Sequence, residues 1–231
     1  MPDPEAVVDM NPGAGRPVWP LAVIVFILTV GIGLLLTNGG REAAPAQAAS
    51  NFQTPAAQEG EQVKIPTLGL SVVRPQAWFT VTAEENAQNI RSVQMNDPEF
   101  QELAARYANS PVFAISKFKE PYADLNPSFK INVRPLGGFA KFSPEDILTA
   151  AIPAMSRVSN DVEVLEGPRA TQVSGQKAAY ARLSYTLRAK DVAVPTVSEI
   201  WIVPKGSIFF MIGAGTRADE KNGSRAEMRR I

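Results

Sequence analysis

The pattern of hydrophobic and polar positions divides the chain into an apolar run, a polar stretch and a long segment of mixed pattern. The apolar run covers residues 18–37 and contains no charged side chain. At a rise of about 1.5 Å per residue, residues 18–36 would form a helix about 28 Å long, close to the roughly 30 Å hydrocarbon core of a bilayer. Trp19 at its edge and Pro20 in its first turn suit this position. The run therefore predicts one transmembrane helix.

A cleaved secretory signal is the competing interpretation of this run. Ala46-Gln47-Ala48 is a small-x-small sequence of the kind that a signal peptidase cuts. However, the run exceeds the roughly 7 to 15 residues of a typical signal core, and this cut would lie past Arg41 and Glu42. A buried helix of a soluble protein would have a polar side, which this run lacks. The pattern favours an uncleaved anchor.

The segments on either side of the run have a different composition. Residues 1–17 combine Pro and Gly with scattered acids, which predicts a disordered tail, and residues 38–62 are rich in Ala, Gln, Gly, Pro and Ser, which predicts a flexible linker. Arg16 and Arg41 on opposite flanks leave the positive-inside rule undecided. Because a single N-terminal anchor commonly exports the chain on its C-terminal side, we expect a cytoplasmic N-terminus, an inner (cytoplasmic or photosynthetic) membrane, and an extracytoplasmic or periplasmic domain over residues 63–231.

Short extended segments recur along this domain. In two of them apolar residues alternate with basic ones, Lys130 and Arg134 in the first and Arg182 and Arg188 in the second, which predicts one buried and one polar face. Pro204-Lys205-Gly206 predicts a tight hairpin. The expected strands are residues 63–66, 70–74, 112–119, 128–135, 162–166, 169–173, 177–188, 196–203 and 207–213.

Helix starts are marked at three places. Asp97 precedes Pro98, Ser143 precedes Pro144, and Ser224 stands three residues before Glu227, which are arrangements typical of helix caps. Apolar residues follow the first two caps at helical spacing. We expect the helix that begins after Ser143 to pack on a sheet. Its predicted inward side is formed by Ile147, Leu148, Ala151, Ile152, Met155 and Val158.

Composition excludes several classes of function. The 231 residues carry no net charge, and residues 61–231 alone carry about +3, too little for the basic face of a nucleic-acid-binding protein. The chain has no Cys and no His. It therefore has no disulfide, thiolate nucleophile, zinc ribbon or iron–sulfur ligand, and no Ser-His-Asp or Cys-His catalytic set.

Several sequence motifs of the domain resemble those of the PsbP-like superfamily, over about residues 63–231. They are an opening formed by Gly69, Leu70, Val72, Pro75 and Trp78, an Asn-Pro loop before a strand, a Ser-Pro-Glu helix start, and Gly175 leading through Ala178, Ala179 and Tyr180 into long hairpin strands. The resemblance implies an α+β fold, an antiparallel β-sheet with helices packed on its faces, used as a binding or accessory module. Members include an extrinsic subunit of the photosynthetic oxygen-evolving complex, a Ran-binding nuclear-transport factor and anchored bacterial proteins of unknown role. The histidines that bind metal in some photosynthetic members have no counterpart here, so no cofactor is expected.

Four basic residues on the predicted polar strand faces are the candidate partner-binding site. If their strands are neighbours, Lys130, Arg134, Arg182 and Arg188 form a basic patch for an anionic partner or lipid headgroups. The alternative is a solvated sheet face, because antiparallel sheets often leave one side in water.

Trp78 and a group of acidic residues are weaker candidates. Trp78 could line a ligand groove, but an aromatic residue just after a strand is more often part of the core. Asp97, Glu99 and Glu102 could bind a hard cation such as Ca²⁺, but they lack the spacing of a calcium loop, and helix capping accounts for Asp97 and Glu99.

Small residues recur within the apolar run, at Thr29, Gly33 and Thr37. This spacing would let a second membrane helix approach closely. The sequence as a whole predicts a non-catalytic accessory or interaction module that is anchored in the lipid bilayer and serves a larger photosynthetic or respiratory membrane complex. The alternatives are an enzyme based on carboxylates or a Ser-Lys pair, and a carrier of a small apolar or lipid ligand.

Overall fold

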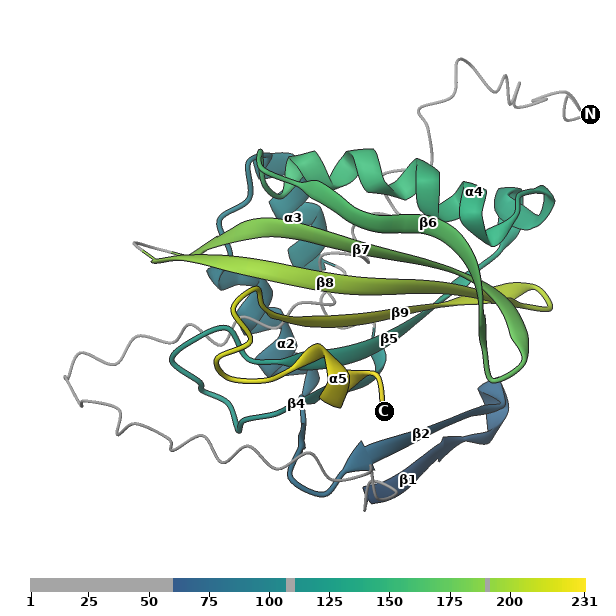
Figure 1. Ribbon diagram of the computed structural model, residues 1–231, viewed down its shortest axis with the longest axis horizontal. Coiled ribbons are helices and arrows are strands. Elements are labelled where there is room, and N and C mark those ends of the chain that lie inside the picture. Colours follow the sequence, from purple (N-terminus) through teal and green to yellow (C-terminus); the bar gives the residue numbers. More distant parts are fainter. Residues whose placement is uncertain (1–59, 107–110, 190–191) are drawn as a thin grey trace, which may run out of the picture.

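A computed structural model describes residues 60–106, 111–189 and 192–231 of the chain. It contains a seven-stranded antiparallel sheet in the order β3-β4-β5-β9-β8-β7-β6 and a separate two-stranded hairpin, β1-β2 (Figure 1). The strands are β1 (Gly60–Ile65), β2 (Leu70–Pro75), β3 (Phe79–Thr80), β4 (Pro111–Ser116), β5 (Ser128–Pro135), β6 (Glu163–Val173), β7 (Gln176–Ala189), β8 (Val192–Lys205) and β9 (Ile208–Arg217). The helices are α2 (Ala83–Ser92), α3 (Pro98–Arg106), α4 (Pro144–Ala151) and α5 (Arg225–Met228), with 3-10 turns η1 (Pro66–Leu68), η2 (Gly137–Lys141) and η3 (Ile152–Arg157).

Each face of the large sheet has its own apolar core. On one face, here called the helix face, α2, α3 and α4 bury residues such as Ile90, Phe100 and Leu148 against the sheet. On the other face, the hairpin face, β2 contributes Val72 and α5 contributes Met228. Figure 1 shows α5 in front of this face and the β1-β2 hairpin beside it. The predicted α+β fold, an antiparallel sheet with helices on its faces, is confirmed.

The helix caps form as the sequence predicts. The Asp97 carboxylate accepts a hydrogen bond from the backbone N–H of Phe100 at 3.1 Å. Ser143 and Ser224 each accept a bond from the N–H three residues on, from Asp146 at 3.1 Å and from Glu227 at 3.2 Å. These bonds satisfy backbone donors that the first turn of a helix leaves without a partner, which fixes where each helix begins.

The structure differs from the predicted elements in several places. The helix predicted after Ser143 ends at Ala151, and the chain continues as the 3-10 turn η3. Helix α2 lies in a polar segment for which we predicted no element, and Thr82 and Glu85 begin it with a reciprocal capping box. Strand β1 begins at Gly60, inside the predicted linker, because Gly60 pairs with Pro75 of β2. Segments 162–166 and 169–173 form one irregular strand, β6.

The N-terminal predictions fall outside the described residues. They are the tail (1–17), the transmembrane helix (18–37) with Thr29, Gly33 and Thr37, and all but the last three residues of the linker (38–62). Within the described ranges, no helix has the length and apolar character needed to cross a bilayer.

Candidate binding site at the open edge of the sheet

The four residues of the predicted basic patch lie on opposite faces of the sheet. Lys130 is opposite Gly213, in the same cross-strand row as Ile200 and Ala181, on the helix face. The neighbouring row, on the hairpin face, contains Arg182. Arg134 shares the face of Lys130, and Arg188 shares the face of Arg182. The prediction that these residues form one patch is therefore wrong.

Lys130 is buried, with 0% of its surface exposed. Its Nζ donates a hydrogen bond to Oδ1 of Asn86 on α2. Burial disfavours the ammonium and lowers the Lys130 pKa from 10.5 to about 7, although the nearby Glu120 carboxylate opposes this shift. Glu120 in turn accepts hydrogen bonds from Asn89 at 3.3 Å and from Asn126 at 3.0 Å. The polar side of β5 thus faces a polar interior beneath α2, where we predicted solvent.

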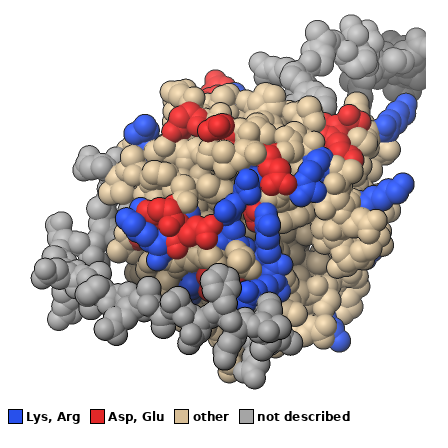
Figure 2. Space-filling model, in the orientation of Figure 1, with Lys and Arg blue, Asp and Glu red and all other residues tan. Residues whose placement is uncertain are grey.

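Arg182 and Arg188 have different surroundings on the hairpin face. The Arg182 guanidinium lies 3.5 Å from the Glu166 carboxylate, and its side chain is 24% exposed. Arg188 is exposed at the far end of β7, where its backbone carbonyl accepts a bond from the N–H of Gln94 at 2.7 Å. Both side chains reach solvent. The face of the molecule seen in Figure 2 carries basic and acidic side chains side by side.

An ion pair between a buried carboxylate and an exposed guanidinium on the hairpin face was missed from the sequence. Glu199 of β8 is 0% exposed and binds the Arg229 guanidinium, with Nε lying 3.0 Å from Oε2. The Tyr180 hydroxyl donates to Glu199 at 2.7 Å and accepts from Arg229 at 2.9 Å. Burial and this bond to the carboxylate raise the Tyr180 pKa to about 12. The pairing joins residues 30 positions apart in the sequence, so no local motif indicates it.

Two weaker candidates have structural roles. Trp78 is 3% exposed and packs in the core of the hairpin face, which confirms the core interpretation. Asp97 caps α3 and binds Arg157, whose Nε lies 2.6 Å from Oδ2, while Glu99 is exposed in the first turn of α3. In the part of the chain that the structure describes, no group of three or more His, Cys, Asp or Glu residues is placed to hold a metal ion.

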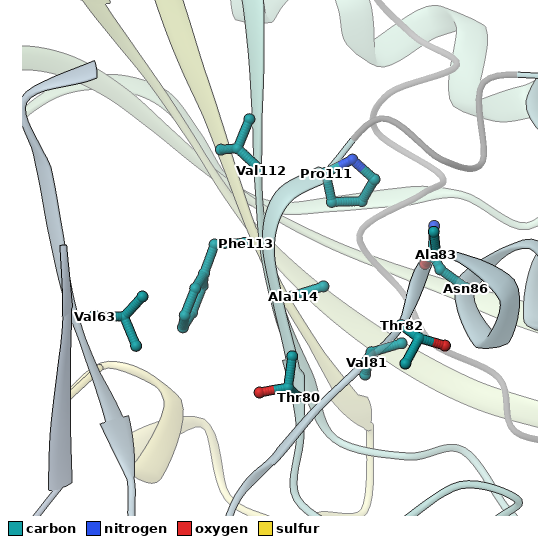
Figure 3. Close-up of a pocket in the computed structure, with 10 residues that line it drawn as sticks. All are labelled: Val63, Thr80, Val81, Thr82, Ala83, Asn86, Pro111, Val112, Phe113 and Ala114. Atoms are coloured by element: carbon teal, nitrogen blue, oxygen red, sulfur yellow. The ribbon is translucent and has the colours of Figure 1, made fainter. Parts of the chain in front are cut away.

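A pocket of about 260 Å³ lies at the β3-β4 edge of the large sheet. In Figure 3, the side chains of Val63 from the hairpin and Phe113 from β4 point toward one another on one side of the pocket. Ala114 and Asn86 lie on its other side, toward α2. The remaining lining residues are Thr80, Val81, Thr82, Ala83, Pro111 and Val112. The pocket is thus mainly apolar and follows β4 from one face of the sheet to the other.

The edge of β4 beside this pocket is only partly paired. Strand β3 pairs with Ile115 and Ser116, and the N–H of Val81 donates to the Ala114 carbonyl at 3.0 Å. After Val81 the chain leaves the sheet to begin α2. Among the described residues, Pro111–Phe113 of β4 therefore have a strand neighbour on the β5 side alone. Pro111 has no N–H to donate, but the other backbone groups on such an edge can pair with an added strand.

Asn86 links the pocket to the buried polar cluster. It lines the pocket and also accepts the bond from Lys130, and Lys130 is paired in register with Ala114, another lining residue. A mainly apolar pocket beside a group with a perturbed pKa is the usual first candidate for a binding site. The sequence contains one signal for this site, since the Thr82–Glu85 capping box marks the start of α2, the helix that contributes Asn86.

A second, shallower groove of about 250 Å³ lies on the hairpin face beside α5. Trp201, Ile212 and Met228 form its apolar surface, and Arg229 stands among its lining residues. The Arg229 guanidinium already binds Glu199, so it has fewer hydrogen-bond donors left for a ligand in this groove.

Comparison with solved structures finds similar folds. The structure of CyanoP, the cyanobacterial PsbP of Synechocystis sp. PCC 6803, matches with a TM-score of 0.41 and 11% identity over 77% of this chain and 89% of that chain. LpqN, involved in cell envelope biogenesis of Mycobacterium tuberculosis, matches with a TM-score of 0.37 and 12% identity over 63% of this chain and 69% of that chain. PA94 of Pseudomonas aeruginosa, a protein of unknown function, matches with a TM-score of 0.36 and 10% identity over 69% of this chain and 84% of that chain.

One of these structures, CyanoP, is a PsbP, the family whose motifs this sequence resembles. No protein-family model matches the sequence, and no curated protein matches it. At these TM-scores the likeness carries no information about ligand or partner, so function has to be argued from the residues of this chain.

Proposed function

We propose that this protein is a membrane-anchored, non-catalytic interaction module that binds an extended segment of a partner protein along the β4 edge. The observation that carries this proposal is the coincidence of the open edge, Pro111–Phe113, with the apolar pocket that adjoins it. In strand addition, backbone hydrogen bonds to the edge provide affinity, and a pocket for alternate side chains provides specificity. The β4 edge and its pocket offer both.

The size of the pocket favours a peptide side chain over a lipid or other small ligand. Its volume of about 260 Å³ is below the roughly 300 to 1,000 Å³ of pockets that enclose a drug-sized molecule. It also lies at the rim of the sheet, while the interior of each face is filled by its own core. A carrier would need an enclosed cavity, so we place the carrier function second.

The chemistry of the pocket favours binding over catalysis. Its polar lining consists of Thr80, Thr82 and Asn86, neutral groups suited to hydrogen bonding with a peptide backbone. Lys130, the nearby residue with base character, is buried and bonds to Asn86. An enzyme based on a Ser-Lys pair would need this amine to reach a bound substrate, and the side chain of Asn86 lies between it and the pocket.

The anchor, the extracytoplasmic location and the membrane complex remain parts of the proposal. They are supported by the uncharged run at residues 18–37 and by the polar segment after it. The expected partners are the lipid bilayer and subunits of a larger photosynthetic or respiratory complex, whereas nucleic acid is not expected.

A pocket-filling variant tests the function. The full chain is purified in mild detergent from its native membrane, as wild type and as Thr80→Tyr, which places a large side chain at the exposed mouth of the pocket. Ser71→Tyr, an equal change on the exposed side of the hairpin, is the matched control. We expect one stoichiometric partner with the wild type and the control, and at least a tenfold weaker association with Thr80→Tyr.

Two results would contradict the proposal. Purification of the wild type as a monomer with no partner removes the interaction function. A partner that binds Thr80→Tyr as tightly as Ser71→Tyr leaves the interaction function in place but excludes the β4 edge as its site.

A further inference from the structure

Four connections meet at one end of the large sheet, here called the turn end. They are η1 with Gly69, the segment 136–143, the β6-β7 turn (Ser174-Gly175) and the β8-β9 turn (Gly206-Ser207). The N–H of Leu136 donates to the Ser207 carbonyl at 2.8 Å. Nζ of Lys205 donates to the carbonyls of Leu68 and Gly69 at 3.2 and 3.0 Å. These bonds join the segment 136–143 to the β8-β9 turn, and the end of β8 to η1.

The turn end carries an exposed aromatic side chain. Phe142 is 47% exposed, one of the two aromatic residues among the exposed large hydrophobic side chains of the described chain. Its ring lies 6.5 Å from that of Phe139, and Phe139 packs on Phe209 of the sheet at 6.4 Å. Phe142 is therefore held at the surface by a ring contact that leads back to the core.

Four exposed lysines lie at the same end of the sheet as this aromatic residue. Lys64, Lys141, Lys177 and Lys205 are exposed there, against two acids, Glu145 and Asp146, in the first turn of α4. Basic side chains project from the right-hand edge of the molecule in Figure 2, where these turns lie in Figure 1. The Asp146 carboxylate is engaged as a helix cap, accepting from the Ser143 hydroxyl at 2.7 Å. The surface thus combines an apolar tip with a surplus of positive charge.

We propose that the turn end docks on the surface of an anionic lipid bilayer, with Phe142 entering the headgroup region and the lysines contacting lipid phosphates. An apolar side chain next to basic ones suits this boundary, because the first gains from leaving water and the second from the negative surface potential. Each lysine near such a surface strengthens binding about fivefold. The inference rests on the proposed anchor, which supplies the bilayer.

The predicted tether would keep the domain close to the bilayer, so a weak interaction between the turn end and the lipid is enough for docking. About 22 residues separate Thr37 from Gly60, which gives an average reach of roughly 23 to 28 Å for a flexible chain. The six residues of β1 span about 20 Å from Gly60 to the turn end. The tether can therefore bring the turn end to the bilayer, and short tethers raise the local concentration to about the millimolar range.

The absence of cysteine from the sequence permits a direct test with a single reporter. Gly138→Cys adds its side chain where no atom lies within 4 Å, and it leaves Phe142 and Lys141 in place. Val164→Cys is the matched control, since Val164 is 44% exposed and lies at the opposite end of β6 from the turn end. Each full-length variant is labelled with a polarity-sensitive fluorophore and reconstituted into vesicles of phosphatidylcholine or of equimolar phosphatidylcholine and phosphatidylglycerol.

We expect the Gly138 probe to shift to the blue and to be quenched by spin-labelled lipid in the anionic vesicles. The fluorophore at position 164 should keep the emission that it has in water and should not be quenched. High salt or Phe142→Ser should reverse the shift, and Lys141→Gln should lower the ratio of docked to undocked protein about fivefold. Lys119→Gln, in the β4-β5 connection at the other end of β5, should have no effect.

The inference is overturned if the emission of the fluorophore at position 138 is the same in both kinds of vesicle as in water. It is also overturned if Phe142→Ser leaves the blue shift unchanged, or if the blue shift is equally large without anionic lipid. The anchor is tested separately by flotation of the vesicles at high salt. If the chain fails to float, the proposed anchor is wrong. The probe then still tests the turn end, because added anionic vesicles at high lipid concentration take the place of the tether.

Discussion

Strands β5 and β7 carry the same alternation of apolar and basic residues, and the structure gives their basic residues opposite environments. Lys130 of β5 is fully buried beneath α2, while Arg182 of β7 remains partly exposed beside Glu166. The alternation of apolar and polar residues indicates which residues share a face of a strand, because side chains point alternately to the two sides. This pattern does not indicate which other element packs over that face. A helix from a different part of the chain decides whether a polar row meets water or a polar interior.

The two faces also differ in how they hold a buried charge. On the hairpin face, Glu199 has a full ionic partner in Arg229 and a hydrogen bond from Tyr180. On the helix face, Lys130 bonds to a neutral amide, and its low pKa reflects the loss of hydration. The Lys130 ammonium beneath α2, whose pKa is lowered to about 7, is close to losing its proton at neutral pH. Substitutions at four positions test this difference, from the largest expected effect to the smallest.

Arg229→Met should have the largest effect. It leaves the buried Glu199 carboxylate without its cation, which costs about 2 to 3 kcal/mol of unfolding free energy, less than for a fully buried pair because Arg229 is half exposed and water can reach the carboxylate. Urea unfolding of the full chain in mild detergent, followed by near-ultraviolet circular dichroism, measures the loss. Arg230→Met, an equal change at the exposed next residue, is the control and should lie within about 0.5 kcal/mol of the wild type. A loss below about 1 kcal/mol for Arg229→Met would show that Glu199 does not need the ion pair.

Asn86→Leu should have the next largest effect, because it removes the acceptor of the Lys130 ammonium. A buried donor that loses a partner costs about 1 to 3 kcal/mol, and the loss should be greatest below pH 7, where Lys130 is protonated. The double variant Asn86→Leu/Lys130→Met should recover most of the loss, since the ammonium is then gone. If the double variant is as unstable as Asn86→Leu alone, the two residues are not coupled.

Lys130→Met should raise the free energy of unfolding by about 1 kcal/mol at pH 6, because an apolar side chain of similar length replaces a buried cation. The wild type has a lowered Lys130 pKa of about 7 against 10.5 when unfolded. Between these values the unfolded chain binds more protons, so the stability contributed by this site rises with pH. The gain of Lys130→Met should therefore be full below pH 7 and shrink up to pH 10.5. A gain that does not vary with pH would contradict the burial of the ammonium.

The sequence predicts the framework of the fold better than the candidate site. Caps at Asp97, Ser143 and Ser224 and the limits of β5 come from local chemistry, and all were predicted. The antiparallel arrangement followed from the family resemblance. In contrast, the position of Lys130 depends on α2, which lies about 44 residues away in the sequence and packs on β5 only in the folded chain.

The pocket could not be predicted for the same reason. It brings together Val63, Asn86 and Phe113, which come from three elements with no periodic relation to one another. The one local signal, the Thr82–Glu85 capping box, would have placed α2. It would not have shown that β3 is only two residues long, which is what leaves the β4 edge open.

Arg182→Met should have the smallest effect and completes the comparison with Lys130→Met, because the same replacement is made in the same kind of alternating strand. The Arg182 guanidinium stands 3.5 Å from Glu166 in a partly exposed pair, and such pairs contribute about 0 to 1 kcal/mol. We expect a change within about 0.5 kcal/mol, weakened further by salt. A loss of about 2 kcal/mol or more would mean that the polar row of the hairpin face is as much a part of the interior as the row beneath α2. In that case, the different environments of β5 and β7 would not arise from what covers each face.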